Sequence, residues 1–148
     1  MRILVVSGPN LSQLGSRDPR HYGSDTLASI LERVRAVAET AGATIEECTS
    51  ESESVLVARL HAARTDGTAA VIVNAGALTH YSLALRDAIE LLDVPVVEVH
   101  LSNVQAREDF RHVSVIAGVC DASIVGLGAL GYELAVRAVV ALVRPSGA

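Results

Sequence analysis

Val94-Pro-Val-Val-Glu-Val-His-Leu-Ser-Asn103 opens the stretch that decides the fold, and Val104-Gln-Ala-Arg-Glu-Asp-Phe-Arg111 completes it. The first part is short, apolar and β-branched, which is typical of a buried parallel strand. Side chains two positions apart share a face of an extended chain, so Glu98, His100 and Ser102 point the same way where the strand ends. A carboxylate two residues from an imidazole can orient the ring and stabilise its charged form.

Two arginines follow this strand. Arg107 and Arg111 are spaced i, i+4, so one face of a helical turn would carry both guanidinium groups. An acid–base group beside two guanidiniums indicates a site for an anionic molecule. The alternative is a strand-end histidine with a satisfied hydrogen bond, next to a solvated charged turn.

Composition narrows the class of protein. The 148 residues, 50% of them apolar, suit one domain over residues 1–148, and the aromatic share of 3% leaves Val, Leu, Ile and Ala to build its core. The net charge of −5 argues against a nucleic acid partner. No apolar run approaches the roughly 18 residues of a membrane span. Residues 1–7 are better interpreted as a first strand than as a signal peptide, so we expect a cytoplasmic protein without a membrane partner.

The reactive side chains exclude several chemistries. Cys48 and Cys120 give neither a disulfide framework nor zinc spacing, and none of the five histidines has ligand spacing, so no metal is expected. All 12 basic residues are arginines. A lysine Schiff base and a P-loop lysine are therefore excluded. Any anion site must use arginine, which favours bidentate contacts with carboxylates and hydroxyl-rich ligands.

Apolar periodicity predicts five strands that alternate with helices. This alternation indicates an α/β fold with a parallel sheet and helices on both faces, and the flavodoxin-like strand order 2-1-3-4-5 is the expected topology. Segment 8–23 is a polar loop long enough to be a functional lid or disordered. Segment 112–122 shows no period. The predicted strands are 3–6, 43–48, 69–73, 94–100 and 123–125, and the predicted helices are 26–41, 50–64, 81–92 and 134–143.

Local signals set the ends of these helices. Ser24 or Asp25 can cap helix 26–41, which Gly42 ends, and Ser50 with Glu53 forms a capping-box pattern for helix 50–64. Tyr81 and Tyr132 stand at helix starts, where we expect them to pack. The glycines of segment 126–131 match G-x-G-x-x-G, but no strand follows, so they are interpreted as turn and packing residues.

Polar residues recur where the predicted strands end. Ligands of such sheets bind beyond the carboxyl ends of the strands, and Asn10, Asn74, His80, His100 and Ser102 all fall there. Three separate segments therefore converge on one edge.

The long loop adds Arg17 and Tyr22. A free phenol is a poor base at neutral pH, and a neighbouring guanidinium makes it a better one because it stabilises the phenolate. The loop can bring both side chains over a substrate. The alternative is that both are ordinary surface residues.

Four linked motifs resemble those of type II 3-dehydroquinate dehydratases, in matching order and spacing over nearly the whole chain. They are Gly8-Pro-Asn-Leu11 with Leu14-Gly-Ser-Arg-Asp-Pro19 and Tyr22-Gly23; Asn74-Ala-Gly-Ala-Leu-Thr-His80 with Ala84-Leu-Arg-Asp-Ala88; Glu98-Val-His-Leu-Ser-Asn103 with Arg107 and Arg111; and Gly126-Leu-Gly128 with Gly131-Tyr132.

The resemblance implies a flavodoxin-like lyase that dehydrates 3-dehydroquinate to 3-dehydroshikimate through an enolate, in the shikimate pathway or in quinate breakdown. It implies no cofactor and no Schiff base, which fits the missing lysine. It also implies assembly as a dodecamer of trimers.

Residue roles follow from the matched positions. Tyr22 is expected to remove the proton α to the ketone, Arg17 to stabilise its phenolate, and Asn10 to help hold a water against the enolate oxygen. His100, oriented by Glu98, is expected to protonate the leaving hydroxyl. The expected substrate-binding positions are Asn74, His80 and Arg111 for hydroxyls, Leu101 and Ser102 for the carboxylate, Arg107 in a cationic wall, and Asp87 reaching a neighbouring subunit's site.

Two segments depart from the family pattern. Thr49-Ser-Glu51 stands where Gln-Ser-Asn is frequent, and Ala117-Gly118 stands where a Ser-Pro pair is usual. Neither touches a matched catalytic position. They leave open a divergent paralogue or a non-catalytic module that binds a small polyhydroxylated carboxylate. A nucleotide or flavin binder of the same fold is a third possibility, disfavoured by the position of the glycine motif.

Overall fold

The computed structural model describes residues 1–143 and contains a five-stranded parallel sheet in the order β2-β1-β3-β4-β5. The predicted topology is therefore confirmed. The strands are β1 Arg2–Ser7, β2 Thr44–Thr49, β3 Ala70–Asn74, β4 Val96–His100 and β5 Ala122–Val125; the helices are α1 Pro19–Tyr22, α2 Leu27–Thr40, α3 Glu53–Ala63, α4 Leu83–Glu90 and α5 Ala129–Val143.

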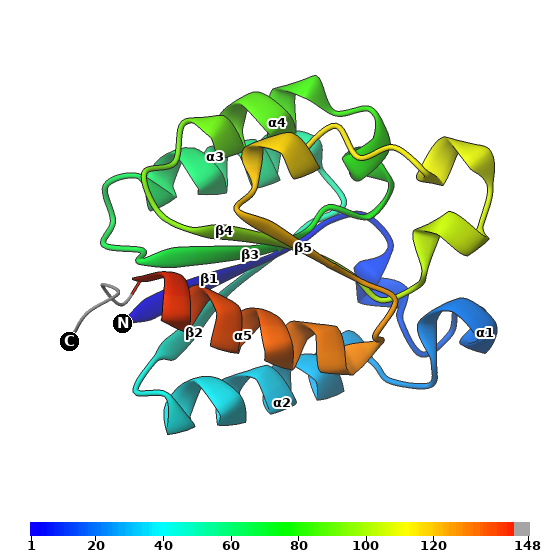
Figure 1. The fold of residues 1–148 in the computed structure, drawn as a ribbon, viewed down its shortest axis with the longest axis horizontal. Helices are drawn as coiled ribbons and strands as arrows, with labels where there is room; N and C mark the ends of the chain where they lie inside the picture. The colour runs from blue at the N-terminus through cyan, green and yellow to red at the C-terminus, as the bar shows by residue number, and fades with distance from the viewer. Residues whose placement is uncertain (144–148) are drawn as a thin grey trace.

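The sheet lies between two helical layers. Helices α2 and α5 cover one face, and α3 and α4 cover the other (Figure 1). The strands β3 and β4 are buried along their whole length because they carry helices on both faces, which explains why Asn74, Glu98 and His100 are their only polar residues. The outer strands β2 and β5 are partly exposed. Apart from Tyr132, the buried side chains of both cores are aliphatic, as the low aromatic share predicts.

Helix ends differ in detail from the prediction. Thr26, and neither Ser24 nor Asp25, caps α2: its hydroxyl accepts from the backbone N–H of Ser29 at 3.1 Å, and the Ser29 hydroxyl accepts from the Thr26 N–H at 3.1 Å. Gly42, with φ +73°, follows α2 as predicted.

The capping box predicted for the second helix is wrong. Helix α3 begins at Glu53 after Ser52, which makes no side-chain capping bond. The Glu53 carboxylate instead accepts a hydrogen bond from Ser82, the residue that caps α4. Glu53 therefore joins two helices and leaves the start of its own helix uncapped.

Both long irregular segments contain short helical turns. Segment 8–23 holds a 3₁₀ turn, Leu11–Gln13, and α1. Glu51 fixes its beginning, because the carboxylate accepts from the Asn10 N–H at 2.8 Å and from the Ser12 hydroxyl at 2.7 Å. The second segment follows β4 and carries three further 3₁₀ turns: Val104–Ala106, Asp109–Arg111 and Ala117–Val119.

The predicted helical turn carrying Arg107 and Arg111 is therefore wrong. Arg107 ends one 3₁₀ turn and Arg111 belongs to the next. The prediction that Tyr81 packs is also wrong, because 66% of it is exposed, whereas Tyr132 is buried as predicted. No helix among residues 1–143 has the length and apolar character needed to cross a bilayer.

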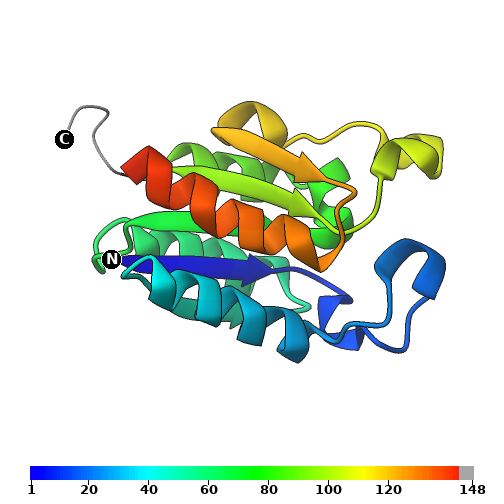
Figure 2. The same cartoon turned by 60° about the horizontal axis from the view of Figure 1, so that its bottom comes forward.

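Two glycines let the loops after β1 and β3 approach each other. A Cβ on Gly8 would collide with the backbone carbonyl of Ala75, and a Cβ on Gly76 would lie 2.8 Å from the Pro9 carbonyl oxygen. Gly76 also has φ +58°, in the left-handed region. The two loops consequently meet beyond the carboxyl edge of the sheet, on the side to which the strand arrows point (Figure 2).

Candidate active site

A cavity of about 120 Å³ lies at this edge, where the loops after β1, β3 and β4 meet. All but two of the residues expected from the sequence line it. These are Asn10, Arg17, Tyr22, Asn74, His80, His100, Leu101, Ser102, Arg107 and Arg111. The sequence did not single out Pro9, Leu11, Gly76, Ala77 and Val104, which complete the lining. The convergence predicted from separate segments is thus present.

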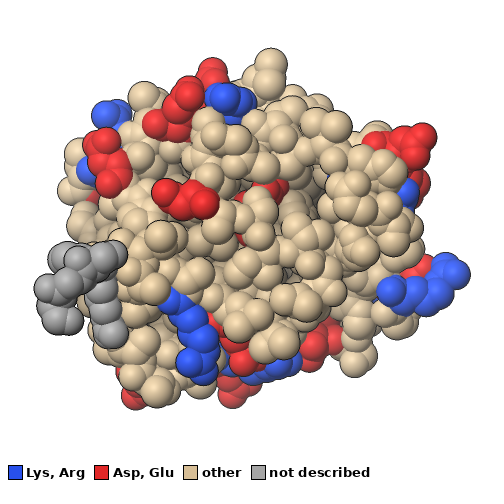
Figure 3. Space-filling view, viewed as in Figure 1, with Lys and Arg blue, Asp and Glu red and all other residues tan. Residues whose placement is uncertain are grey.

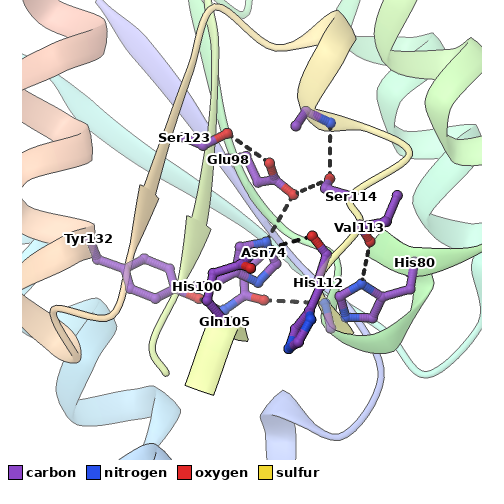
Figure 4. Close-up of polar contacts among 12 residues, drawn as sticks. Asn74, His80, Glu98, His100, Gln105, His112, Val113, Ser114, Ser123 and Tyr132 are labelled. Carbon is purple, nitrogen blue, oxygen red and sulfur yellow. Dashed lines mark hydrogen bonds and ion pairs between the residues drawn. The ribbon is translucent and has the colours of Figure 1, made fainter. Parts of the chain in front are cut away.

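His100 and Glu98 form a buried pair at the end of β4. His100 Nε2 lies 2.9 Å from Glu98 Oε1, and only 1% of Glu98 is exposed. The hydroxyl of Ser114 donates to the same carboxylate oxygen at 2.7 Å, and the hydroxyl of Ser123 donates to Oε2 at 2.8 Å (Figure 4). Glu98 itself does not line the cavity but lies behind His100.

These contacts favour the ionised form of Glu98. Burial acts to raise the pKa of this carboxyl group, but the hydrogen bond from His100 and then that from Ser114, the charge of His100 and the bond from Ser123 together hold the pKa below its ordinary value. An ionised carboxylate can only accept hydrogen bonds, so His100 Nε2 carries a hydrogen. The other ring nitrogen, Nδ1, is left for the cavity that His100 lines.

Two guanidinium groups surround Tyr22. Arg107 Nη1 donates to the phenol oxygen at 2.8 Å and to the Ser102 hydroxyl at 3.1 Å. The Arg17 guanidinium carbon lies 3.9 Å from the centre of the Tyr22 ring, a cation–π arrangement. Arg107 is thus the guanidinium at the oxygen, and Arg17 lies over the face of the ring. The sequence had assigned Arg107 only to a cationic wall.

Asn74 is fixed from beneath the cavity. Its Nδ2 donates to the Tyr132 hydroxyl at 3.0 Å, and its Oδ1 accepts from the Gly76 N–H at 3.2 Å. Burial raises the pKa of Tyr132 to about 12, so this phenol stays neutral and serves as a structural acceptor.

Two more polar side chains are held by the second irregular segment. His80 Nδ1 lies 2.7 Å from the Val113 carbonyl oxygen, so that nitrogen carries a hydrogen and donates it. Arg111 donates from Nε to Glu108 at 2.7 Å. These contacts fix the side chains of His80 and Arg111. They leave His80 Nε2 and the two terminal nitrogens of Arg111 for a ligand.

Asp87 is the second expected residue that does not line the cavity. It lies exposed on α4. No sequence pattern indicates Ser114 and Ser123, which hold Glu98 behind His100, and Tyr132 is expected only to pack, whereas its hydroxyl also holds Asn74. Among residues 1–143, no group of three or more His, Cys, Asp or Glu side chains could hold a metal ion.

The fold and cavity together define a class of protein: a flavodoxin-like α/β protein in which one cavity is lined by a carboxylate-backed imidazole and by a phenol that two guanidiniums contact. The sequence model of the family described as dehydroquinase class II matches residues 1–140. The chain therefore belongs to the class II dehydroquinase family.

Relatives agree with this family. A 3-dehydroquinate dehydratase of Leptothrix cholodnii is 47% identical over 148 residues, covering 100% of this chain and 99% of the relative. A catabolic 3-dehydroquinase of Sclerotinia sclerotiorum is 49% identical over 138 residues, covering 92% and 90%. The crystal structure of a type II dehydroquinase from Butyrivibrio crossotus superimposes with a TM-score of 0.92 at 37% identity, covering 94% of this chain and 97% of that one.

Proposed function

We propose that this chain is a 3-dehydroquinate dehydratase that forms 3-dehydroshikimate through an enolate, with Tyr22 as base and His100 as acid. The observation that carries the proposal is the placement of these two groups in one cavity. Arg107 bonds to the phenol oxygen, Arg17 lies over the phenol ring, and Glu98 bonds to the imidazole. The curated relatives of similar length carry the same activity in their names.

The first step is removal of the proton α to the ketone. The Tyr22 phenolate takes this proton, and the electron pair of the broken C–H bond moves to the carbonyl oxygen as an enolate. The Arg107 hydrogen bond and the stacked Arg17 stabilise the phenolate that precedes the step. Asn10, in the loop beside them, helps hold a water against the enolate oxygen.

The second step expels the hydroxyl group. The enolate electrons form the new C=C bond, the C–O bond breaks, and His100 Nδ1 gives its proton to the departing oxygen, which leaves as water. The base has then gained a proton and the acid has lost one. Exchange with solvent resets both groups for the next turnover.

The remaining lining residues bind the substrate. Asn74, His80 and Arg111 are assigned to its hydroxyl groups, and Leu101 with Ser102 to its carboxylate. Arg107 bonds to both Ser102 and Tyr22, so the carboxylate site and the base share one guanidinium. Substrate binding at Ser102 therefore acts on the group that stabilises the phenolate.

Ultraviolet absorbance tests the proposed activity. The product contains a conjugated enone and 3-dehydroquinate does not, so the purified chain should produce a steady rise in absorbance. Binding of 3-dehydroquinate without this rise would instead identify a non-catalytic module that kept the pocket.

Borohydride separates the enolate route from Schiff-base catalysis. The chain contains no lysine, so treatment with borohydride in the presence of 3-dehydroquinate is expected to leave its activity unchanged. Intact-protein mass spectrometry after treatment should show the unmodified mass. A covalent adduct with loss of activity would contradict the enolate mechanism.

We also propose a homo-oligomer, a dodecamer of trimers, acting in the cytoplasm. Asp87 is exposed and does not line the cavity of its own chain, and Leu83 on the same helix is 62% exposed. Phe110 and Val113 are 59% and 65% exposed. The face that carries β5 has few charged side chains near its middle (Figure 3).

The free thiols of Cys48 and Cys120 suit the reducing environment of the cytoplasm.

Light scattering and one substitution test the assembly. We expect a particle much larger than a dimer, and we expect Asp87→Ala to lower kcat without dissociating it, because Asp87 reaches a neighbouring subunit's site. Arg64→Ala, an exposed change at the C-terminal end of α3, is the control and should leave both kcat and the size of the particle unchanged. A fully active monomer would refute the assembly.

A further inference from the structure

We propose that Ser123 is a positioning residue of the acid: its hydroxyl, together with that of Ser114, keeps the proton shared by Glu98 and His100 on the imidazole. This inference rests on the proposed function, in which His100 protonates the leaving hydroxyl. Neither serine belongs to the residues that line the cavity.

Strand register places Ser123 at Glu98. The two residues are partners in the β4–β5 ladder, so their side chains project from the same face of the sheet. The Ser123 hydroxyl donates to Oε2 at 2.8 Å, whereas His100 and Ser114 both bond to Oε1 (Figure 4). Among residues 1–143, Ser123 is the only side chain that donates to Oε2.

The location of the shared proton decides whether His100 is an acid. Consider the Glu98–His100 pair with a hydrogen on His100 Nδ1 and one further proton shared between the two residues. That proton can lie on Nε2, which gives a carboxylate and an imidazolium. It can also sit on Glu98, giving a carboxylic acid and a neutral imidazole. Only the imidazolium is acidic enough at Nδ1 to protonate a departing hydroxyl. Hydrogen bonds donated to the carboxylate favour the first arrangement, because they stabilise negative charge on Glu98.

Other titratable groups near Glu98 do not replace these hydroxyls. Burial, followed by the charges of Glu98 and Asp121, raises the pKa of Cys120 to about 12, so this thiol stays neutral. A hollow of about 230 Å³ lies beside Glu98, Ser114 and Ser123, and the titratable groups that line it with Glu98 and His100 are His80, Arg111 and His112. None of these three donates a hydrogen bond to Glu98.

Ser123 is a cleaner site for substitution than Ser114. The Ser114 hydroxyl also accepts from the Ala117 N–H at 3.0 Å, so its removal would disturb the following turn as well. Ser123 makes one side-chain hydrogen bond in the described part of the chain and is itself exposed on the edge strand β5. Threonine and valine both suit a strand and differ only by hydroxyl against methyl, which makes them a matched pair.

The experiment compares Ser123→Val with Ser123→Thr. For Ser123→Val we expect kcat to fall about 10- to 100-fold, the scale of one hydrogen bond to a charged group, with KM nearly unchanged. The variant should also lose the Ser123 hydrogen bond, which is one of the contacts that lower the Glu98 pKa. Since that pKa then rises, the acidic limb of the kcat profile should move to higher pH. Ser123→Thr should retain wild-type kcat and pH profile.

A second measurement needs no turnover. Carbon-13 NMR titration of glutamate-labelled protein, with Glu98 assigned from Glu98→Gln, should show a raised Glu98 pKa in Ser123→Val and a wild-type value in Ser123→Thr. Equal Glu98 titrations and equal kcat profiles for the two variants would overturn the inference. So would an equal loss of kcat in both variants when both keep the melting temperature of the unmodified chain. If the unmodified chain fails to dehydrate 3-dehydroquinate, the proposed function fails, while a shifted Glu98 titration would still establish the Ser123 contact.

Discussion

Tyr22→Phe is expected to abolish turnover while leaving the dissociation constant for 3-dehydroquinate close to that of the unmodified chain. The phenol oxygen is needed only when the proton moves, so its loss removes transition-state stabilisation alone. A general base typically contributes about 10²–10⁴-fold. We expect a loss at or above the upper end, because among the described residues that line the cavity only Tyr22 has one guanidinium at its oxygen and another over its ring.

Three arginine variants serve as comparisons for this prediction. Arg107→Ala should lower kcat because it removes the hydrogen bond to the phenol oxygen, and Arg17→Ala should resemble it through loss of the stacked charge. Arg111→Ala should mainly raise KM, since that side chain is assigned to the bound substrate. Steady-state kinetics with calorimetric binding separates the two patterns. Near-normal kcat in Tyr22→Phe would show that another residue is the base.

His100→Ala is expected to lower kcat by about 10²–10⁴-fold, the usual contribution of a general acid, with a smaller effect on substrate binding. The departing hydroxyl would then have to leave as hydroxide or take its proton from water. Glu98→Gln should give a partial loss, because an amide cannot hold the imidazolium charge although it fills the same buried space.

His80→Ala is the matched control for this second prediction. Both histidines line the cavity, but the His80 ring is held by the Val113 carbonyl and bonds to no carboxylate among residues 1–143. Its loss should raise KM more than it lowers kcat. A larger fall in kcat for His80→Ala than for His100→Ala would reverse the assignment of the acid.

The strand order could be predicted because β3 and β4 are short, apolar and separated by helix-length segments. Helix ends were harder, since several polar residues compete for each cap. Thr26 prevails over Ser24 and Asp25 because Ser29 completes a reciprocal pair with it. The segment after β4 was misjudged as one helical turn. Its backbone instead folds into two successive 3₁₀ turns that bring Arg107 and Arg111 to the cavity, and helical spacing carries no information about such a path.

The residues that line the site could be predicted far better than those that support them. Side chains at strand ends converge by topology, so Asn74 and His100 were predictable from strand order alone. Ser123 was not, because its contact with Glu98 depends on the register between β4 and β5, which the sequence pattern leaves free. The Arg107–Tyr22 bond joins residues 85 positions apart through irregular segments, so no local pattern indicates it.

The central claim is that the base and the acid are separate groups, one acting before the enolate forms and the other after it. Proton NMR of 3-dehydroquinate in deuterium oxide, in the presence of the His100→Ala variant, tests this claim. Tyr22 remains in this variant, so we predict that the α-proton signal fades by exchange while little product appears. The same signal should persist with Tyr22→Phe. An α-proton that persists in bound, correctly folded His100→Ala, or one that exchanges normally with Tyr22→Phe, would contradict the account.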